Sequence, residues 1–364
     1  MIPPELDRKL GMLSYLTSSP RIKGKLREKL SDFIVDEVLR GYRASRVFLG
    51  LTPFQFPPGA YLYVVVAKFS AVDTNNISRV ISRKLEGRVR FAGLKDARAV
   101  VFQFFSIEGH YKAKVIETDG IRAIPIGRGR EPISRGSNDG NYFTIVVRGV
   151  DNAPLLEKFP NFFSYQRFGV RRPFNHEIGK LLLLRDLEGA KSMIQMQGYD
   201  VSDAKSLREM ASILGVNRLR FYINAYQSYL FNILLSKRLE DGISPKKGDF
   251  ILKGGEISLY PNEGHLLLPL IGAFTREKPG WLMDKVNEVL REEGVEKDMF
   301  IFKELPEISA LGGFRRAIEE VSSLKVVRGN DRIVLSFYLR SGTYATSYLR
   351  ELIKPTDPVR QGFI

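Results

Sequence analysis

The sequence contains no cysteine, one tryptophan and only three histidines among its 364 residues. Without cysteine the chain can form no disulfide, no iron–sulfur cluster and no zinc site with thiolate ligands, and it has no thiol nucleophile. His110, His176 and His265 lie far apart in the sequence, which argues against a histidine-rich metal centre. The composition therefore directs attention to carboxylate and amide chemistry without a metal.

Long apolar runs, repeats and low-complexity tracts are also absent. The longest apolar runs, 61–67 and 265–274, fall short of the roughly 20 residues that a membrane-spanning helix needs. The first ten residues, MIPPELDRKL, lack the apolar core of a signal peptide. We therefore expect a soluble protein of the cytoplasm, a reducing compartment.

Positive charge is what the sequence has in excess. Lys and Arg total 56 against 41 Asp and Glu, which leaves a formal net charge of +15. Such an excess favours polyanionic partners, and 24 Phe and 15 Tyr could stack on unpaired bases. The alternative interpretation is an ordinary solvated charged surface; the combination of charge and aromatic residues favours RNA.

Strand patterns occur near both ends of the chain and helical patterns in its middle. Basic residues at every second position from Arg21 to Lys29 would share one face of a strand. The segment 121–140, rich in glycine and arginine, is expected to be a flexible basic loop. The patterns predict strands at 61–69, 99–107 and 141–149, and a hairpin of strands at 325–327 and 332–339. They also predict a helix capped by Asn76 and helices at 175–196, 202–214 and 219–238.

One acidic residue stands on a short segment between two expected strands. Residues 93–98, Gly-Leu-Lys-Asp-Ala-Arg, separate VRFAG from AVVFQFFSI, so Asp96 should be presented on a loop. Taken alone, an aspartate in such a loop is most often a turn residue, and its wider sequence context decides whether it has another role.

Six segments together resemble the TruD family of tRNA pseudouridine synthases, and the resemblance covers most of the chain. The segment FAGLKDARAVVFQFFS (91–106) is similar to the family signature around its catalytic aspartate. The other similar segments, in the family's order, are DFIVDE (32–37), GNYFTIVVR (140–148), QRFGVRR (166–172), AYQSYLFN (225–232) and SGTYATSYLREL (341–352). The N-terminal LDRKLGMLSYLT is most similar to archaeal members.

The resemblance implies a set of site residues. Asp96 corresponds to the catalytic aspartate, Asn141 to an active-site asparagine, and Phe143 to the aromatic residue that stacks on the target base. Phe33 and Tyr344 correspond to further substrate contacts. The supporting residues are Arg27 as the first candidate for a cation beside Asp96, Lys95 and Arg350 as the other basic candidates, and Gln103, which with Ser106 would orient the loop.

The implied reaction breaks the C1′–N1 bond of uridine and joins C5 to C1′, so no group is gained or lost and no cofactor is expected. One carboxylate suffices, either as a nucleophile at C1′ or as a base that removes a sugar proton. The uridine must be flipped out of the folded RNA, and aromatic faces recover part of that cost.

Further residues have weaker assignments. Arg167, Arg171 and Arg172 are candidates for phosphate contacts, and His176 is expected to be a hydrogen-bonding residue at a helix start. Val101 departs from the family pattern, which usually has threonine there, so a hydroxyl near Asp96 is lost.

The resemblance implies an α+β fold: a pseudouridine-synthase core with a mixed or antiparallel sheet, interrupted by an inserted α-rich domain. We expect the core at 1–159 and 311–364, the insertion at 160–310, and a basic cleft between them that holds RNA. The expected reaction is isomerisation of the uridine at tRNA position 13, by a monomer that needs no protein partner and no membrane. The alternatives are a non-catalytic RNA-binding protein or chaperone, and a metal-dependent nuclease.

Overall fold

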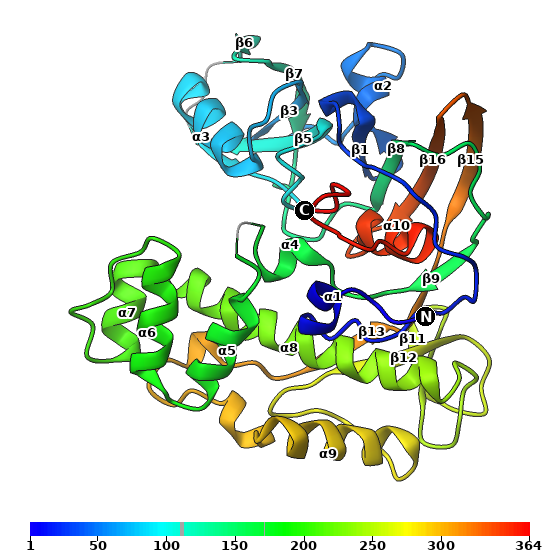
Figure 1. Cartoon of the computed structure of the whole chain (residues 1–364). Coiled ribbons are helices and arrows are strands. Elements are labelled where there is room, and N and C mark those ends of the chain that lie inside the picture. Colours follow the sequence, from blue (N-terminus) through cyan, green and yellow to red (C-terminus); the bar gives the residue numbers. More distant parts are fainter. Residues whose placement is uncertain (110–112, 171) are drawn as a thin grey trace.

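The structure is a computed structural model that describes residues 1–109, 113–170 and 172–364. It has two parts, one above the other in Figure 1: a large β-sheet with its helices, and a layer of helices with a small sheet. The C-terminus lies between the two parts (Figure 1). The C-terminal segment therefore lies where the two parts meet.

The upper part is built around a ten-stranded sheet to which both ends of the chain contribute. The strand order is β15-β16-β8-β1-β5-β3-β7-β6, with β2 on β1 and β4 on β5. Because β1 and β5 run parallel and β1 and β8 antiparallel, the sheet is mixed. The α+β prediction is confirmed. The strands are β1 (Phe33–Leu39), β2 (Tyr42–Arg43), β3 (Tyr61–Lys68), β4 (Arg88–Arg90), β5 (Val100–Glu108), β6 (Ile116–Thr118), β7 (Ile121–Gly129), β8 (Gly140–Arg148), β15 (Ser322–Gly329) and β16 (Arg332–Arg340).

Helices cover both faces of this sheet. On one face lies α3 (Thr74–Leu85), which buries Ile77, Ile81 and Leu85 at helical spacing against β3 and β5. On the other lies the short α2 (Ala44–Phe48). The cap of α3 is Asp73, not Asn76 as predicted: the Asp73 carboxylate accepts from the backbone N–H of Asn76 at 2.9 Å. The helix thus begins two residues before Asn76.

The lower part is dominated by α8 (Val216–Glu240), with both helices and a small sheet around it (Figure 1). Among the described residues, no helix is both long and apolar enough to cross a membrane. Around α8 are α4 (Tyr165–Phe168), α5 (Asn175–Leu183), α6 (Leu187–Met196), α7 (Leu207–Leu214) and α9 (Trp281–Glu293), and the sheet β11-β10-β12-β13 of β10 (Phe250–Lys253), β11 (Glu256–Leu259), β12 (His265–Leu270) and β13 (Gly313–Arg316).

Three connections join the two parts. The short strands β9 (Lys158–Pro160) and β14 (Ile318–Glu320) pair where the chain leaves the large sheet and where it returns. The helix α1 (Glu5–Lys9) lies on the lower part, because Asn232 and Ser236 of α8 donate to the carbonyls of Leu10 and Gly11 at 2.9 and 2.8 Å. The helix α10 (Ala345–Ile353) follows β16 and packs between the parts (Figure 1). The first residues thus contact the α-rich part.

Two other predictions from the pattern are wrong. Residues 121–129 form the strand β7, which pairs with β3, because Ile121 and Ala123 are buried under α3 while Arg122 and Arg128 alternate with them along the strand. The predicted helix 175–196 is two helices, because the chain turns at Arg185, whose φ is +61°. In both places tertiary packing outweighs a local composition rich in glycine or in helix formers.

We predict that the buried ion pair between Asp7 and Arg350 stabilises the contact between the chain ends. Arg350 Nε donates to Asp7 Oδ2 at 2.5 Å, and both side chains are at most 1% exposed. Asp7→Ala would leave the guanidinium buried and unpaired, which should cost about 3–5 kcal/mol of unfolding free energy. Denaturant unfolding measures this. The control is Glu5→Ala, which removes an exposed ion pair two residues away and should change little; equal effects of both variants would contradict the prediction.

Candidate functional site

The registers of the large sheet bring the expected site residues to one face. Residues directly opposite each other on paired strands point to the same side. One such row crosses five strands, in the order Lys68 of β3, Val101 of β5, Val35 of β1, Phe143 of β8 and Phe337 of β16. The next row places Glu37 of β1 opposite Asn141 of β8. Strand pairing therefore makes one surface from segments far apart in the sequence.

Asp96 lies beside this face, on the loop between β4 and β5, and is paired with Arg27. Arg27 Nη2 is 2.6 Å from Asp96 Oδ2; the arginine side chain is 2% exposed and that of Asp96 24%. The alternating basic residues from Arg21 to Lys29 predicted a strand that includes Arg27. Apart from an isolated bridge at Lys25, the segment forms no strand, and Arg27 has a φ of +56°, which turns its side chain inward. The prediction that the basic residues from Arg21 to Lys29 share one face of a strand is therefore wrong.

Three contacts hold the Arg27 guanidinium in place. Its Nη1 donates to the carbonyl oxygen of Gly362 at 2.7 Å, and its Cζ lies 4.1 Å from the centroid of the Phe33 ring. The third contact is the ion pair with Asp96. Because the cation is already ordered by the C-terminal segment and by Phe33, it balances the charge of the carboxylate without rearrangement.

The other two basic candidates do not contact Asp96. Lys95 Nζ donates to Asn141 Oδ1 at 2.7 Å and forms an ion pair with Glu37 Oε1 at 2.7 Å. Arg350 is bound to Asp7 in the core, so its place as a reserve partner of Asp96 is corrected. Sequence neighbours on an extended loop point apart, which is why Lys95 turns away from Asp96 toward the sheet.

Lys68, which the sequence analysis did not select, holds the loop that carries Asp96. Its Nζ donates to the carbonyl oxygens of Asp96, Ala97 and Val72 at 2.7, 2.7 and 3.0 Å. An ammonium has three donors, so all are used. Burial lowers the pKa of Lys68 to about 8. The signal in the sequence was a lysine that ends the otherwise apolar strand YLYVVVAK, opposite Val101, where no hydroxyl is available to the loop.

Gln103 and Thr74 hold the same loop from other elements. Gln103 Nε2 donates to the carbonyl oxygen of Gly93 at 2.7 Å, and Thr74 Oγ1 accepts from the backbone N–H of Lys95 at 2.9 Å. Ser106 does not act on the loop: its hydroxyl accepts from the backbone N–H of Ile133 at 2.8 Å, which corrects the expectation for it.

Three aromatic rings beside the site, those of Phe33, Phe143 and Phe337, contact one another. Phe143 stacks on Phe337 with ring centroids 5.5 Å apart and meets Phe33 edge to face at 6.2 Å. Phe33 is itself covered by Arg27, whereas Tyr344, at the N-terminus of α10, is half-buried. Phe143 and Tyr344 therefore stand on different elements of the same wall.

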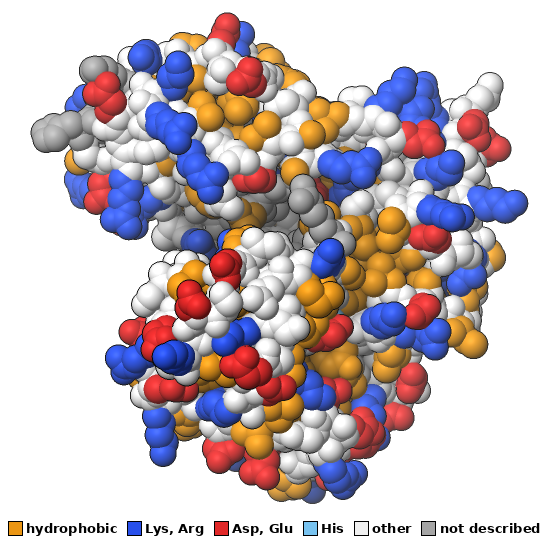
Figure 2. Space-filling model, turned by 60° about the vertical axis from the view of Figure 1, so that its left-hand side comes forward, with side chains coloured by type: hydrophobic (Ala, Val, Ile, Leu, Met, Phe, Trp, Pro, Cys, Tyr) orange, Lys and Arg blue, Asp and Glu red, His pale blue; other side chains and the backbone are white. Residues whose placement is uncertain are grey.

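A cavity of about 360 Å³ brings these groups together where the two parts of the molecule meet. Among the residues that line it are Phe33, Asp96, Asn141, Phe143 and Tyr344. Its volume lies in the range of about 300–1,000 Å³ common for small-molecule sites. Figure 2 shows the surface hollowed between the upper and lower parts, with Lys and Arg side chains on the upper part beside the hollow.

The lower part contributes Gln166, which the sequence analysis did not single out. Gln166 Nε2 lies 3.5 Å from Asp96 Oδ2, so α4 reaches the carboxylate. Its neighbour Arg167 donates to Ser228 Oγ at 3.0 Å and lies over Phe163, and Arg172 donates to the carbonyl of Met196. Of the three predicted phosphate ligands, Arg167 and Arg172 thus have partners within the protein.

Three of the remaining residues named in the sequence analysis are Arg171, His110 and His176. Arg171 and His110 are outside the described residues. His176 is buried in the lower part between Phe168 and Tyr229, and burial lowers its pKa to about 4, so it is neutral at physiological pH. Within the described part of the chain, no group of three or more His, Asp or Glu side chains is placed to hold a metal ion.

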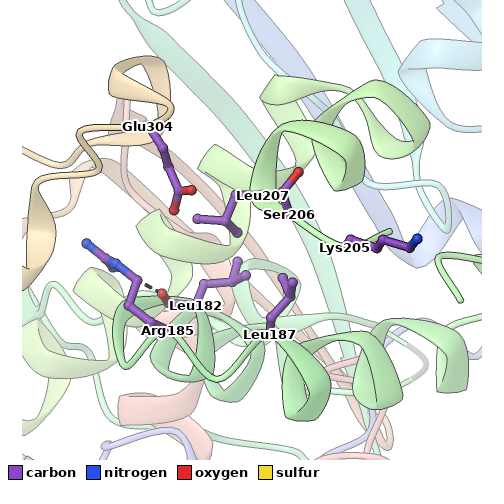
Figure 3. A pocket seen from close by; sticks show the side chains of 7 residues that line it. All are labelled: Leu182, Arg185, Leu187, Lys205, Ser206, Leu207 and Glu304. Atoms are coloured by element: carbon purple, nitrogen blue, oxygen red, sulfur yellow. Dashed lines mark hydrogen bonds between the residues drawn. The ribbon is translucent and has the colours of Figure 1, made fainter. Parts of the chain in front are cut away.

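A second, smaller cavity of about 170 Å³ lies within the helices of the lower part (Figure 3). Leu182, Leu187 and Leu207 meet at its centre, and Lys205 points away from them (Figure 3). Arg185 donates to the main-chain carbonyls around it. The cavity contains no ion pair comparable to Arg27 and Asp96, so the larger cavity is the candidate site.

Comparison with known proteins agrees with this geometry. The family model described as "tRNA pseudouridine synthase D (TruD)" matches residues 9–214 and 195–352. The chain belongs to the TruD family of tRNA pseudouridine synthases. The resemblance of the six segments is thereby confirmed.

Similar TruD proteins occur in archaea. The chain is 32% identical to the probable tRNA pseudouridine synthase D of Pyrobaculum neutrophilum over 99% of both chains, and 30% identical to that of Thermococcus sibiricus over 93% of this chain and 97% of that one. Among solved structures, the putative tRNA pseudouridine synthase D (TruD) of Methanosarcina mazei matches with a TM-score of 0.72 and 27% identity, over 99% of this chain and all of the other.

We predict that Lys68 makes activity depend on pH through the loop it holds. Above about pH 8 the ammonium loses one of three donors, so pseudouridine formation should fall as the pH rises through that value. Fold stability should not fall with it: because the pKa of Lys68 is lower in the folded chain than in the unfolded chain, its contribution to stability rises from about pH 8 toward pH 10.5.

The variant Lys68→Met separates this effect from other titrations. Its activity at neutral pH should be about 10- to 100-fold lower, since the loop with Asp96 is displaced. Its residual activity should lack the decline above pH 8. A Lys68→Met protein with wild-type rate and pH profile would contradict the assignment.

Proposed function

We propose that the protein isomerises the uridine at position 13 of tRNA to pseudouridine, with Asp96 as the catalytic carboxylate. The observation that carries the proposal is the Arg27–Asp96 ion pair at the edge of a cavity lined by Phe143 and Asn141. A carboxylate, a balancing cation, an aromatic face and an amide are the groups that this reaction requires of a protein.

The reaction conserves every atom of the nucleotide. The C1′–N1 bond breaks, the uracil turns within the site, and C5 bonds to C1′. C5 then loses its proton and N1 gains one, so the base keeps its composition. Asp96 acts in one of two ways. As a nucleophile it forms a bond to C1′ that breaks when C5 bonds to C1′; as a base it removes a proton from the sugar and returns it when the C–C bond has formed. No redox equivalent enters the balance, so the proposal includes no cofactor.

Arg27 supports either role of Asp96. A base that enters the cavity displaces water from the carboxylate, which makes its negative charge costly. The guanidinium at 2.6 Å offsets that cost, and it can do so at once because Gly362 and Phe33 already hold it. The carboxylate therefore keeps its charge where it faces the ribose.

Access to the cavity requires that the nucleotide leave its stack. Flipping a base costs a few kcal/mol, and a stacked aromatic ring returns about 1–3 kcal/mol per base. In the proposed complex Phe143 stacks on the uracil, and Phe33 and Tyr344 complete the wall. The net charge of +15 attracts the tRNA backbone.

The organisation of the chain fits a substrate held between two domains. We place the catalytic domain at 1–159 and 311–364 and the insertion at 160–310, with the enzyme working as a monomer in the cytoplasm, where tRNA is available. Gln166 is the insertion's contribution to the site, because it reaches Asp96 from α4.

The decisive experiment is Asp96→Asn. The variant keeps the shape of the side chain but has neither a nucleophilic nor a basic oxygen at neutral pH, so pseudouridine formation should fall by at least about 10⁴-fold. tRNA binding should persist. The measurement is mapping of pseudouridine in a tRNA transcript, alongside a transcript with cytidine at position 13, which should remain unmodified.

The control is Asp284→Asn, an exposed position on α9 far from the cavity. Its rate should equal that of the wild type. Activity retained in Asp96→Asn would remove Asp96 from its role, and a wild-type protein that binds tRNA without making pseudouridine would favour the RNA-binding alternative.

A second variant tests the cation. Arg27→Lys preserves the charge and should keep a measurable rate, whereas Arg27→Met should reduce the rate constant of the chemical step by about 10- to 1,000-fold. Single-turnover rates with saturating enzyme measure this step directly. Equal rates for both variants would show that the charge at position 27 does not matter.

A further inference from the structure

The Asn141 amide is held in one orientation by the groups behind it. Lys95 Nζ lies 2.7 Å from Asn141 Oδ1. An ammonium group has donors and no acceptor, so the amide oxygen of Asn141, and not its nitrogen, must face Lys95. The Nδ2 group must then point the other way.

The lysine is itself fixed by a buried carboxylate. Glu37 Oε1 is 2.7 Å from Lys95 Nζ, the Glu37 side chain has no exposed surface, and that of Lys95 is 7% exposed. The other carboxylate oxygen accepts from the backbone N–H of Phe104 at 2.9 Å. Since Glu37 stands opposite Asn141 in the β1–β8 register, Lys95 reaches from its loop to two neighbouring side chains of the sheet.

The free end of the amide faces the substrate cavity. Asn141 lines the cavity beside Asp96 and Phe143. Among the described residues, no group accepts a hydrogen bond from Asn141 Nδ2, so this donor is available to a ligand. An amide free to turn could offer either an acceptor or a donor; here the choice is made by Glu37 and Lys95 before any ligand enters.

We propose that Asn141 recognises the target base only as a donor, through Nδ2, to a carbonyl oxygen of uracil, and that Lys95 and Glu37 are the positioning residues that impose this direction. The inference rests on the proposed function. Uracil offers two carbonyl acceptors and one N–H donor on its edge, and the fixed amide selects an acceptor.

Two substitutions of Asn141 give opposite expectations for the two directions of the amide. Asn141→Asp replaces only the donor with an acceptor. If Nδ2 faces the base, the new oxygen repels the uracil carbonyl, and aspartate is worse than alanine. If Oδ1 faced the base, aspartate would keep that contact, gain an ion pair with Lys95, and be better than alanine.

The test measures base recognition without turnover. Each protein carries Asp96→Asn, and its Kd is measured for a tRNA transcript with uridine at position 13 and for one with an abasic nucleotide there. Repulsion of the phosphates by a new charge affects both RNAs equally, so the ratio of the two Kd values reports the base alone. Asn287→Asp, which adds the same charge on an exposed position of α9, is the matched control and should leave the ratio unchanged.

The ratio of abasic to uridine Kd should be highest with Asn141, fall about fivefold or more with Asn141→Ala, and fall further with Asn141→Asp. A ratio for Asn141→Asp at or above that of Asn141→Ala would overturn the proposal. Failure of the proposed function would be seen separately, as a wild-type protein that forms no pseudouridine in the uridine transcript.

Lys95→Met tests the positioning role. Without the lysine the amide is free to turn, so the ratio should fall by about threefold or more, closer to that of Asn141→Ala. A purely structural role would lower the melting temperature and leave the ratio intact, which would overturn the part assigned to Lys95. If Lys95→Met does not fold, the order of the three residues at position 141 decides the proposal by itself.

Discussion

The site depends on one electrostatic constraint: a carboxylate at the edge of an apolar cavity must keep a cation in contact. In this chain the cation is Arg27, and its position depends on three contacts at once. The guanidinium contacts Asp96, which lies 69 residues further along the chain, Gly362 near the C-terminus, and Phe33 at the start of β1. The ion pair therefore depends on the C-terminal segment, because the Gly362 carbonyl oxygen holds Arg27 beside Asp96.

Two lysines with buried side chains hold the loop that carries Asp96. Lys68 binds the loop's carbonyl oxygens from below, and Lys95 extends from the loop to Glu37 and Asn141 on the sheet. Strand pairing fixes the positions of these contacts, because Lys68 belongs to β3 and the partners of Lys95 face each other on β1 and β8. Burying such cations is costly unless their donors are satisfied. The hydrogen bonds and ion pair that compensate for the burial of the two lysines also fix the loop and the Asn141 amide. The same contacts therefore stabilise the fold and position the site.

The lower part completes the site and does not merely flank it. Gln166 of α4 approaches Asp96 from the lower part, and Val170 lines the same cavity. The cavity thus has one side on the sheet and one on the helices. In the proposed complex this cavity holds a single extruded nucleotide beside the carboxylate, and the basic surface around it contacts the rest of the RNA.

How far the sequence could predict the structure differed from element to element. The apolar strand at β3 and the alternation in β8 were readable because the period of side-chain burial in a strand is local. The strand β7 was not, because its glycines and arginines resemble a loop and only its pairing with β3 shows that it is a strand. Lys68 was missed for a related reason: a lysine at the end of a strand is ordinarily solvated, and its partners lie on a loop about 30 residues further along the chain.

By itself, the sequence determined the chemistry available to the protein: no thiol, few histidines, an excess of positive charge, and a set of motifs around Asp96, Asn141 and Phe143 that resembles one family. Only the tertiary structure decided which basic residue meets Asp96 and which way Asn141 faces. Residues 27 and 96 are joined by a backbone turn at positive φ and by the closure of the chain ends, and Asn141 is directed by a lysine 46 residues away. Contacts of this kind arise from the three-dimensional path of the chain, and no local pattern of residues encodes them.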